Sequence, residues 1–195
     1  ARVDFAYFCD VVGDKPPATH HKEWHKYLCT GEDTECLIGI GGPNIDILAP
    51  RGSAKSTVLG LFTAWAIGIH ALHKKPLKIL YISYTVDVAR PKSAAIKRII
   101  EDSKLYKEIF PTVKIAKGVS SNEYWSIDWK FAGIKSTGEE EFTICCAGLK
   151  GAVTSKRSHL CIIDDAIKSA ADIKNRDIRK EMEDNWNSVI VPTMF

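Results

Sequence analysis

The feature that most constrains this chain is a change of hydrophobic period near its fiftieth residue. Residues 44–49, Asn-Ile-Asp-Ile-Leu-Ala, alternate as in a short strand, and the alternation ends at Pro50 and Gly52. Over residues 56–72 the apolar side chains recur instead at helical spacing. The sequence therefore predicts a strand, a tight turn and a buried helix in immediate succession.

The turn between these elements, residues 49–57, has the composition of a phosphate-binding loop, and we call it the phosphate loop. Backbone N–H groups of such a turn and of the following helix N-terminus point at one place, and the helix dipole adds to their attraction for phosphate. Lys55 is expected to reach the β- and γ-phosphates of a nucleotide, and the Ser56 hydroxyl to bind Mg²⁺. The predicted nucleotide-binding residues are Pro50, Arg51, Gly52, Ser53, Ala54, Lys55, Ser56 and Thr57.

The phosphate loop departs from the usual pattern G-x-x-x-x-G-K-[ST], because Ala49 and Ala54 occupy the two glycine positions of that pattern. A methyl group at Ala54 is tolerable only if that backbone angle is not deeply left-handed, whereas Gly52 keeps the turn flexible. Arg51 is expected beside the γ-phosphate as a catalytic cation that binds the anion bidentately; a surface cation is the alternative. An ordinary loop before a basic helix start is the alternative for the whole motif.

A second motif consists of paired carboxylates. Residues 160–163 are apolar and Asp164 and Asp165 follow directly, as expected where a buried strand emerges at its carboxyl edge. In α/β sheets ligands bind at that edge. Asp164 is expected to hold Mg²⁺ through water, and Asp165 to act as the base or to position the water that attacks the γ-phosphate. Together, the phosphate loop and the pair of carboxylates predict an ATPase that uses ATP and Mg²⁺.

The rest of the chain alternates strand-like and helical patterns. This alternation favours an α/β fold with a mainly parallel central sheet flanked by helices. Because the two motifs predict an ATPase, we expect this fold to belong to the ASCE/RecA-like class of P-loop NTPases. Further strands are expected at residues 78–83 and 142–147, an antiparallel hairpin strand at 125–131, and helices at 16–30, 86–103 and 173–191. Residues 1–38 are expected to form a helical, lid-like preamble, and residues 39–195 the ATPase core.

Composition limits the class of protein. Of the 195 residues, 45% are hydrophobic, which is enough for one sizeable core and argues against disorder. The net charge of +3 is too mild to indicate a nucleic-acid partner by itself; the basic run in residues 90–117 is read first as a solvated helix face. No window approaches the roughly 18 apolar residues of a membrane span, and no charged-then-apolar leader begins the chain. We therefore expect neither membrane insertion nor secretion.

The cysteine pattern indicates reduced thiols of an intracellular protein. The six cysteines include no tandem C-x-x-C pairs. One cluster offers a zinc site as a lesser alternative, because His21, His25 and Cys29 recur every four residues and Cys36 follows. These residues lack a standard zinc-finger spacing, so a surface histidine row is the preferred interpretation.

The two motifs resemble those of the large terminase subunits of tailed bacteriophages. Phosphate loops of that family carry the same Arg-Gly start and often have alanine before the lysine, so the glycine departures support the resemblance. The resemblance covers about residues 40–190, and its specific part is the phosphate loop and the double-acid strand. The matching residues are 50–57, Ile162-Ile163-Asp164-Asp165-x-x-Lys168, Ser83-Tyr84-Thr85, Phe110-Pro111 and Gly148-x-x-Gly151.

This resemblance implies a motor that threads double-stranded DNA into an empty procapsid. It implies a homo-oligomeric ring on the portal protein, a small terminase subunit as partner, and a place in the host cytoplasm with transient docking on the procapsid. It also implies a C-terminal nuclease domain and a coupling motif, neither of which is found in this sequence. We therefore expect an isolated ATPase domain, monomeric on its own, with nuclease activity belonging only to the missing domain.

Ring ATPases commonly complete their site with a cation from the next subunit. Lys150 and Arg157, before the double-acid strand, are the candidates, and both are alternatively surface cations. The closest rival function is a helicase- or recombinase-type DNA translocase, which shares both motifs. A binding module that no longer hydrolyses nucleotide and a small-molecule kinase are the remaining alternatives.

Overall fold

A five-stranded sheet with strand order β2-β3-β4-β1-β5 forms the centre of the protein. The computed structural model describes residues 4–14, 16–28, 45–50, 52–136, 138, 141–151, 156–167, 169 and 174–194. The strands are β1 (Ile79–Ser83), β2 (Ile115–Ser120), β3 (Tyr124–Ile127), β4 (Ile144–Gly148) and β5 (Leu160–Ile163). Strand β1 pairs in parallel with β4 and β5, whereas the β2–β3 and β3–β4 pairs are antiparallel.

The α/β class is thus confirmed, but the expectation of a mainly parallel sheet is wrong. Only the half of the sheet built by β4, β1 and β5 is parallel. Strands β2 and β3 are joined by a short turn in which the Ser121 hydroxyl accepts from the Tyr124 N–H group. A turn of this length has no room for the crossover helix that parallel neighbours need. The predicted hairpin strand ends at Ile127, so Trp129 and Phe131 fall in a turn instead.

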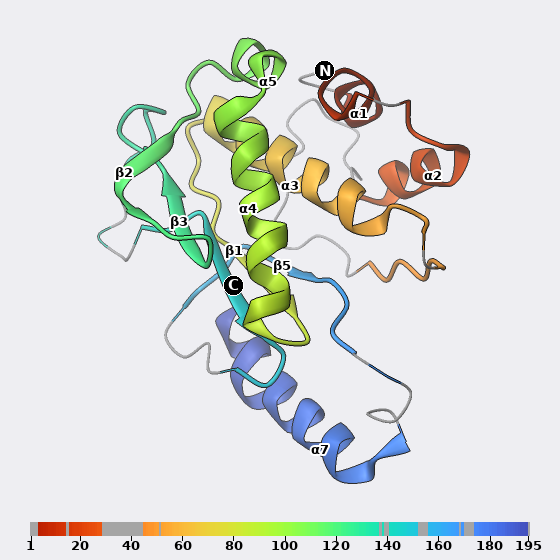
Figure 1. The fold of residues 1–195 in the computed structure, drawn as a ribbon. Coiled ribbons are helices and arrows are strands. Elements are labelled where there is room, and N and C mark those ends of the chain that lie inside the picture. The colour runs from red at the N-terminus through yellow and green to blue at the C-terminus, as the bar shows by residue number, and fades with distance from the viewer. Residues whose placement is uncertain are drawn as a thin grey trace.

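Helices cover both faces of the sheet. The helices are α1 (Phe5–Gly13), α2 (Thr19–Leu28), α3 (Lys55–Leu72), α4 (Val86–Asp102), α5 (Lys104–Ile109) and α7 (Arg176–Asn185). Helices α1 to α5 lie together, and α7 lies apart from them (Figure 1). After α7 the chain continues as a π-helical turn, Trp186–Ile190, and a 3-10 turn, Val191–Thr193.

The side chains of β1 divide between two apolar clusters. Ile79 and Tyr81 join the main cluster with α1, α3 and α4, whereas Leu80 and Ile82 join the second cluster with the turn after α7. Alternate residues of a strand point to opposite faces, and all five residues of β1 are buried. Strand β1, which lies between β4 and β5, is therefore buried on both faces and has a helical layer packed on each.

Helix α3 is buried on nearly all sides, because it packs against both α1 and α4. Of the described helices, it alone is long and apolar enough to cross a membrane by length and composition. About two thirds of its apolar window, 67%, is buried inside the protein, as in a core helix. Phe5 and Phe8 of α1, which the sequence analysis did not single out, supply part of the core around it.

The strand expected before the phosphate loop is not formed. Residues 45–50 have no regular secondary structure, and the Leu48 side chain is 97% exposed; Asn44 lies outside the described residues. Alternating residues become a strand only when a ladder partner is available. Strand β5 is at the edge of the sheet formed by the described residues, and an isolated parallel bridge between Ser158 and Met194 lies just before it in the chain.

The other predicted elements form with shifted ends. The helix expected at 16–30 begins at Thr19 and the one expected at 86–103 ends at Asp102. The last helix begins at Arg176, where the Asn175 side chain accepts from two N–H groups of the first turn. Residues 170–173, where that helix was expected to begin, lie outside the described part of the chain.

The packing of α3 against Phe110 gives a test of the fold. A Cβ atom added to Gly68 would lie 2.5 Å from ring carbons of Phe110, whereas one added to Gly60 would meet only Ile96, at 3.8 Å. We expect Gly68→Ala to lower the free energy of unfolding by about 1–3 kcal/mol through overpacking. Gly60→Ala on the same helix should leave it unchanged or raise it by up to ~1 kcal/mol. Urea denaturation measures both, and equal effects would contradict this packing.

Candidate functional site

The candidate site lies where the first turn of α3 meets the carboxyl ends of β1 and β5. Lys55 is the first residue of α3, and Asp164 and Asp165 directly follow β5. Because β1 and β5 are parallel, with Ile82 opposite Ile163, both strands end at the same edge of the sheet. The structure thus brings together sequence-predicted residues that lie 110 positions apart.

Asp164 is completely buried at this edge, and β1 fixes its position. Its N–H group donates to the Ile82 carbonyl at 2.9 Å, and its own carbonyl accepts from the Ser83 hydroxyl at 2.7 Å. The Tyr81 hydroxyl donates to Asp164 Oδ2 at 3.3 Å. Burial, followed by the Asp164 charge, raises the pKa of Tyr81, so this hydroxyl stays protonated and remains a donor.

Asp165 is held by its backbone and presents its carboxylate to solvent. Its φ of 55° is left-handed, and its carbonyl accepts from the Tyr84 N–H group at 3.1 Å. The side chain is 56% exposed. The two adjacent acids therefore differ in environment: one is buried and anchored, and the other is accessible to water.

Two lysines bridge both carboxylates. Lys55 Nζ lies 3.4 Å from Asp164 Oδ1 and 3.2 Å from Asp165 Oδ1. Lys92 Nζ, from α4, lies 2.7 Å from Asp164 Oδ2 and 3.1 Å from Asp165 Oδ2. Two formal positive charges thus balance two negative ones. We call Lys55, Lys92, Asp164 and Asp165 the ion network.

The ion network shifts the titration of its exposed members. The hydrogen bond from Lys92 is the largest cause that lowers the pKa of Asp165, and Lys55 adds to it against partial burial. Burial by itself would lower the pKa of Lys55, but the hydrogen bond to Asp165 and the charges of both acids outweigh it and raise that pKa. The Lys55 ammonium and the Asp165 carboxylate are therefore both charged at neutral pH.

Lys92 is the site residue that the sequence analysis missed, because it assigned this lysine to a solvated basic face. The position of Lys92 in the sequence, early in the helix that follows β1, could have indicated that it belongs to the site. Only two residues separate the end of β1 from the start of α4, so the first turns of α4 lie at the carboxyl edge of the sheet, where ligands bind in α/β folds. A lysine early in such a helix can reach the acids that follow the neighbouring strand.

The phosphate loop is a turn with two left-handed residues. Ser53 N–H donates to the Pro50 carbonyl at 3.3 Å, and Gly52 has a φ of 84°. Ala54 has a φ of 57° and precedes α3, whose first turn receives no side-chain cap from the described residues. Ser56 and Thr57 lie in that first turn, half-buried and exposed respectively, and Arg51 lies outside the described residues.

The expectation that Ala54 avoids a left-handed backbone is therefore wrong. Its methyl group is accommodated in the conformation that glycine takes most easily, at a cost of about 1–2 kcal/mol. Apart from its chain neighbours, no described residue has an atom within 4 Å of the position where a Cβ of Gly52 would be. The loop thus keeps a glycine-type shape although one of its left-handed positions carries alanine.

Helix α2 contacts the loop through His21. The Ala18 N–H group donates to His21 Nδ1 at 3.2 Å, so His21 Nε2 carries the proton and donates to the Ser53 carbonyl at 2.8 Å. Cys9 Sγ lies 3.8 Å from His25 Nε2. Burial, followed by the charge of His21, lowers the pKa of His25.

These contacts bear on the alternative zinc site. Among the described residues, no group of three or more His, Cys, Asp or Glu side chains is placed to hold a metal ion. Cys29 and Cys36 lie outside those residues. His21 instead joins α2 to the phosphate loop.

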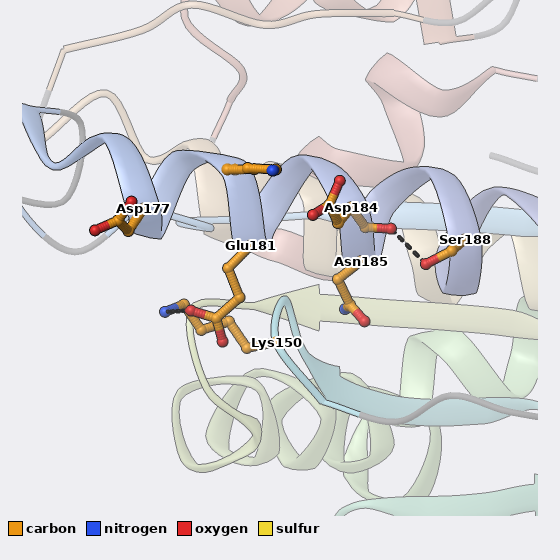
Figure 2. A pocket seen from close by; sticks show the side chains of 7 residues that line it. Lys150, Asp177, Glu181, Asp184, Asn185 and Ser188 are labelled. Atoms are coloured by element: carbon orange, nitrogen blue, oxygen red, sulfur yellow. Dashed lines mark hydrogen bonds and ion pairs between the residues drawn. The ribbon is translucent and has the colours of Figure 1, made fainter.

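The two candidate cations from a neighbouring subunit have different surroundings. Lys150 Nζ lies 2.6 Å from Glu181 Oε2 of α7, and Figure 2 shows this pair at one side of a shallow groove. The groove has a volume of about 440 Å³ and includes no residue of the loop or of the ion network. Arg157 is exposed and immediately precedes Ser158.

The donor set fits a magnesium ion. Asp164 Oδ1 is buried and accepts no hydrogen bond from any described residue; its one close cation, Lys55 Nζ, is at 3.4 Å. A buried carboxylate oxygen of this kind needs a partner, and a hard divalent cation or its bound water supplies one. The Ser56 hydroxyl is next to Lys55 in the first turn of α3, and Lys55 reaches Asp164, so Ser56 and Asp164 are the residues that could hold the ion.

Comparison with known proteins adds no family to this picture. No protein-family model matches the sequence, and no curated protein matches it.

The left-handed Ala54 gives a second test. We expect Ala54→Gly to raise the free energy of unfolding by about 1 kcal/mol, because glycine takes this conformation without a Cβ clash. Ala66→Gly, inside the same helix, should lower it by about 1 kcal/mol or more. Thermal unfolding compares the two variants with the wild type. Destabilisation by both would mean that Ala54 is not left-handed.

Proposed function

We propose that this chain is an ATP-hydrolysing domain of the P-loop, ASCE/RecA-like class. The observation that carries the proposal is the approach of Lys55, at a helix N-terminus, to within 3.4 Å of both Asp164 and Asp165. An uncapped helix N-terminus with a lysine attracts phosphate, and paired carboxylates attract a divalent cation. A magnesium-bound triphosphate needs both features in one place.

Each residue has a role that follows from its surroundings. The Lys55 ammonium exchanges its carboxylate partners for the β- and γ-phosphates, while N–H groups of the first turn of α3 donate to the same phosphates. Ser56 and Asp164 are the residues that would hold Mg²⁺, which when bound neutralises charge on the phosphates. Asp164 suits this role because Tyr81 and Ser83 fix its position.

Asp165 is the general base in the proposed hydrolysis of ATP. Its exposed carboxylate can orient a water molecule and accept its proton as the terminal phosphate is attacked. Lys55 and Lys92 hold its pKa down, so the carboxylate becomes a better proton acceptor once these cations leave it. Binding of the phosphates, which draws Lys55 away, thereby prepares the acid for catalysis. Arg51, in the phosphate loop, is proposed as a further cation that binds the γ-phosphate.

We also propose the process that the ATPase drives, which is translocation of double-stranded DNA into a viral procapsid. The support is the resemblance of residues 50–57 and 162–165 to large terminase subunits. The proposed partners are the portal protein, the small terminase subunit and copies of this chain in a ring, in the host cytoplasm. Lys150 and Arg157 are both proposed as cations that act on a neighbouring subunit, and Lys150 contacts Glu181 of α7 within this chain.

Two substitutions separate binding from hydrolysis. Lys55→Ala should weaken ATP binding about tenfold or more, because a charge-assisted contact to phosphate is lost. Asp165→Asn should keep ATP binding and lower turnover by about 10²-fold or more, because the proton acceptor is removed. Titration calorimetry measures the first effect, and phosphate release under saturating ATP measures the second.

Matched controls come from exposed residues outside the site. Lys114→Ala removes a lysine paired with Asp128, and Asp177→Asn removes an acid from the first turn of α7. Neither control should change binding or turnover. Unchanged turnover in Asp165→Asn would reject its assignment as the base, and unchanged affinity in Lys55→Ala would reject the phosphate loop.

A further inference from the structure

Lys92 contacts the acid pair more closely than Lys55 does, yet it belongs to a different helix. Its ammonium nitrogen lies 2.7 Å from Asp164 Oδ2 and 3.1 Å from Asp165 Oδ2, and it donates to the Asp164 carbonyl at 3.3 Å. The side chain is 18% exposed. A cation of the site thus comes from outside the phosphate loop.

The backbone that carries Lys92 is firmly packed. The next residue, Ser93, is completely buried and accepts a hydrogen bond from the Trp125 indole at 2.8 Å. Ala89 and Ile96, on the same face of α4, are also completely buried. A lysine has a flexible four-carbon stem, so the Lys92 ammonium can change partners while the helix stays in place.

Electrostatics gives the ammonium a reason to change partners. Asp164 is the proposed magnesium ligand, and a second cation less than 3 Å from its Oδ2 would be repelled by the bound ion. Asp165, the other partner of Lys92, is the proposed base. Lys92 and Lys55 contact the same two carboxylates, so a terminal phosphate bound at Lys55 would offer the Lys92 ammonium a new anion.

We infer that Lys92 binds the γ-phosphate and thereby makes the site distinguish a nucleoside triphosphate from a diphosphate. This inference rests on the proposed ATPase function. With a diphosphate, Lys92 keeps its contact with Asp165, because no terminal phosphate competes for its ammonium group, and it contributes nothing to affinity. With a triphosphate it gains a charge-assisted contact and releases Asp165 as proton acceptor.

The test is the ratio of affinities for a slowly hydrolysed ATP analogue and for ADP, both with Mg²⁺. Lys92→Gln should lower affinity for the ATP analogue about tenfold or more and leave affinity for ADP within about twofold. Lys92→Arg, which keeps the charge, should restore most of the lost affinity. Lys97→Ala, on the same helix but in contact with Ser120, is the matched control and should behave as wild type.

Several outcomes would overturn the inference, and they differ from failure of the ATPase proposal. Equal loss of both affinities, or no loss, in a folded Lys92→Gln protein would reject the γ-phosphate role while wild-type binding still supported the ATPase. A wild type that binds neither nucleotide would reject both. If Lys92→Gln does not fold, the inference is tested on the wild type, by measuring how fast Lys92 is acylated with and without each nucleotide. The ATP analogue should protect Lys92 and ADP should not, and equal protection would contradict the inference.

Discussion

A buried carboxylate that needs cations is the constraint on which this site depends. Asp164 has no exposed surface, and an unpaired charge in such a place is strongly unfavourable. Lys55 and Lys92 compensate it from two different helices, so the ion network joins the first turn of α3, the second turn of α4 and the end of β5. The charges fix these elements relative to one another at the edge of the sheet where a ligand can enter.

The sheet makes this meeting possible. Central strand β1 is covered on both faces, and its parallel pairing with β5 sets the two carboxyl ends level. Tyr81 and Ser83, at that end of β1, then donate to the side chain and the backbone of Asp164. The apolar packing of α3 between α1 and α4 places the phosphate loop beside these acids. Packing thus positions the elements, and a few polar contacts set the geometry of the site.

The sequence predicted the parts of this arrangement that depend on local pattern. Helix α3, strands β1 and β5 and the approach of Lys55 to the acids follow from periodicity and from the rule that parallel strands end together. The antiparallel β2–β3–β4 half and the unpaired residues 45–50 depend on which strands find partners, which a local pattern does not encode. Lys92 was missed for a related reason, because only the tertiary fold brings α4 against Asp164.

A crystal structure with a non-hydrolysable ATP analogue and Mg²⁺ tests the account most directly. We predict that the β- and γ-phosphates contact Lys55 and the first turn of α3. The metal ion should lie between those phosphates and the residues Ser56 and Asp164. The Lys55 ammonium should have left both carboxylates. A nucleotide bound at another surface, with Lys55 still paired to Asp164 and Asp165, would contradict it.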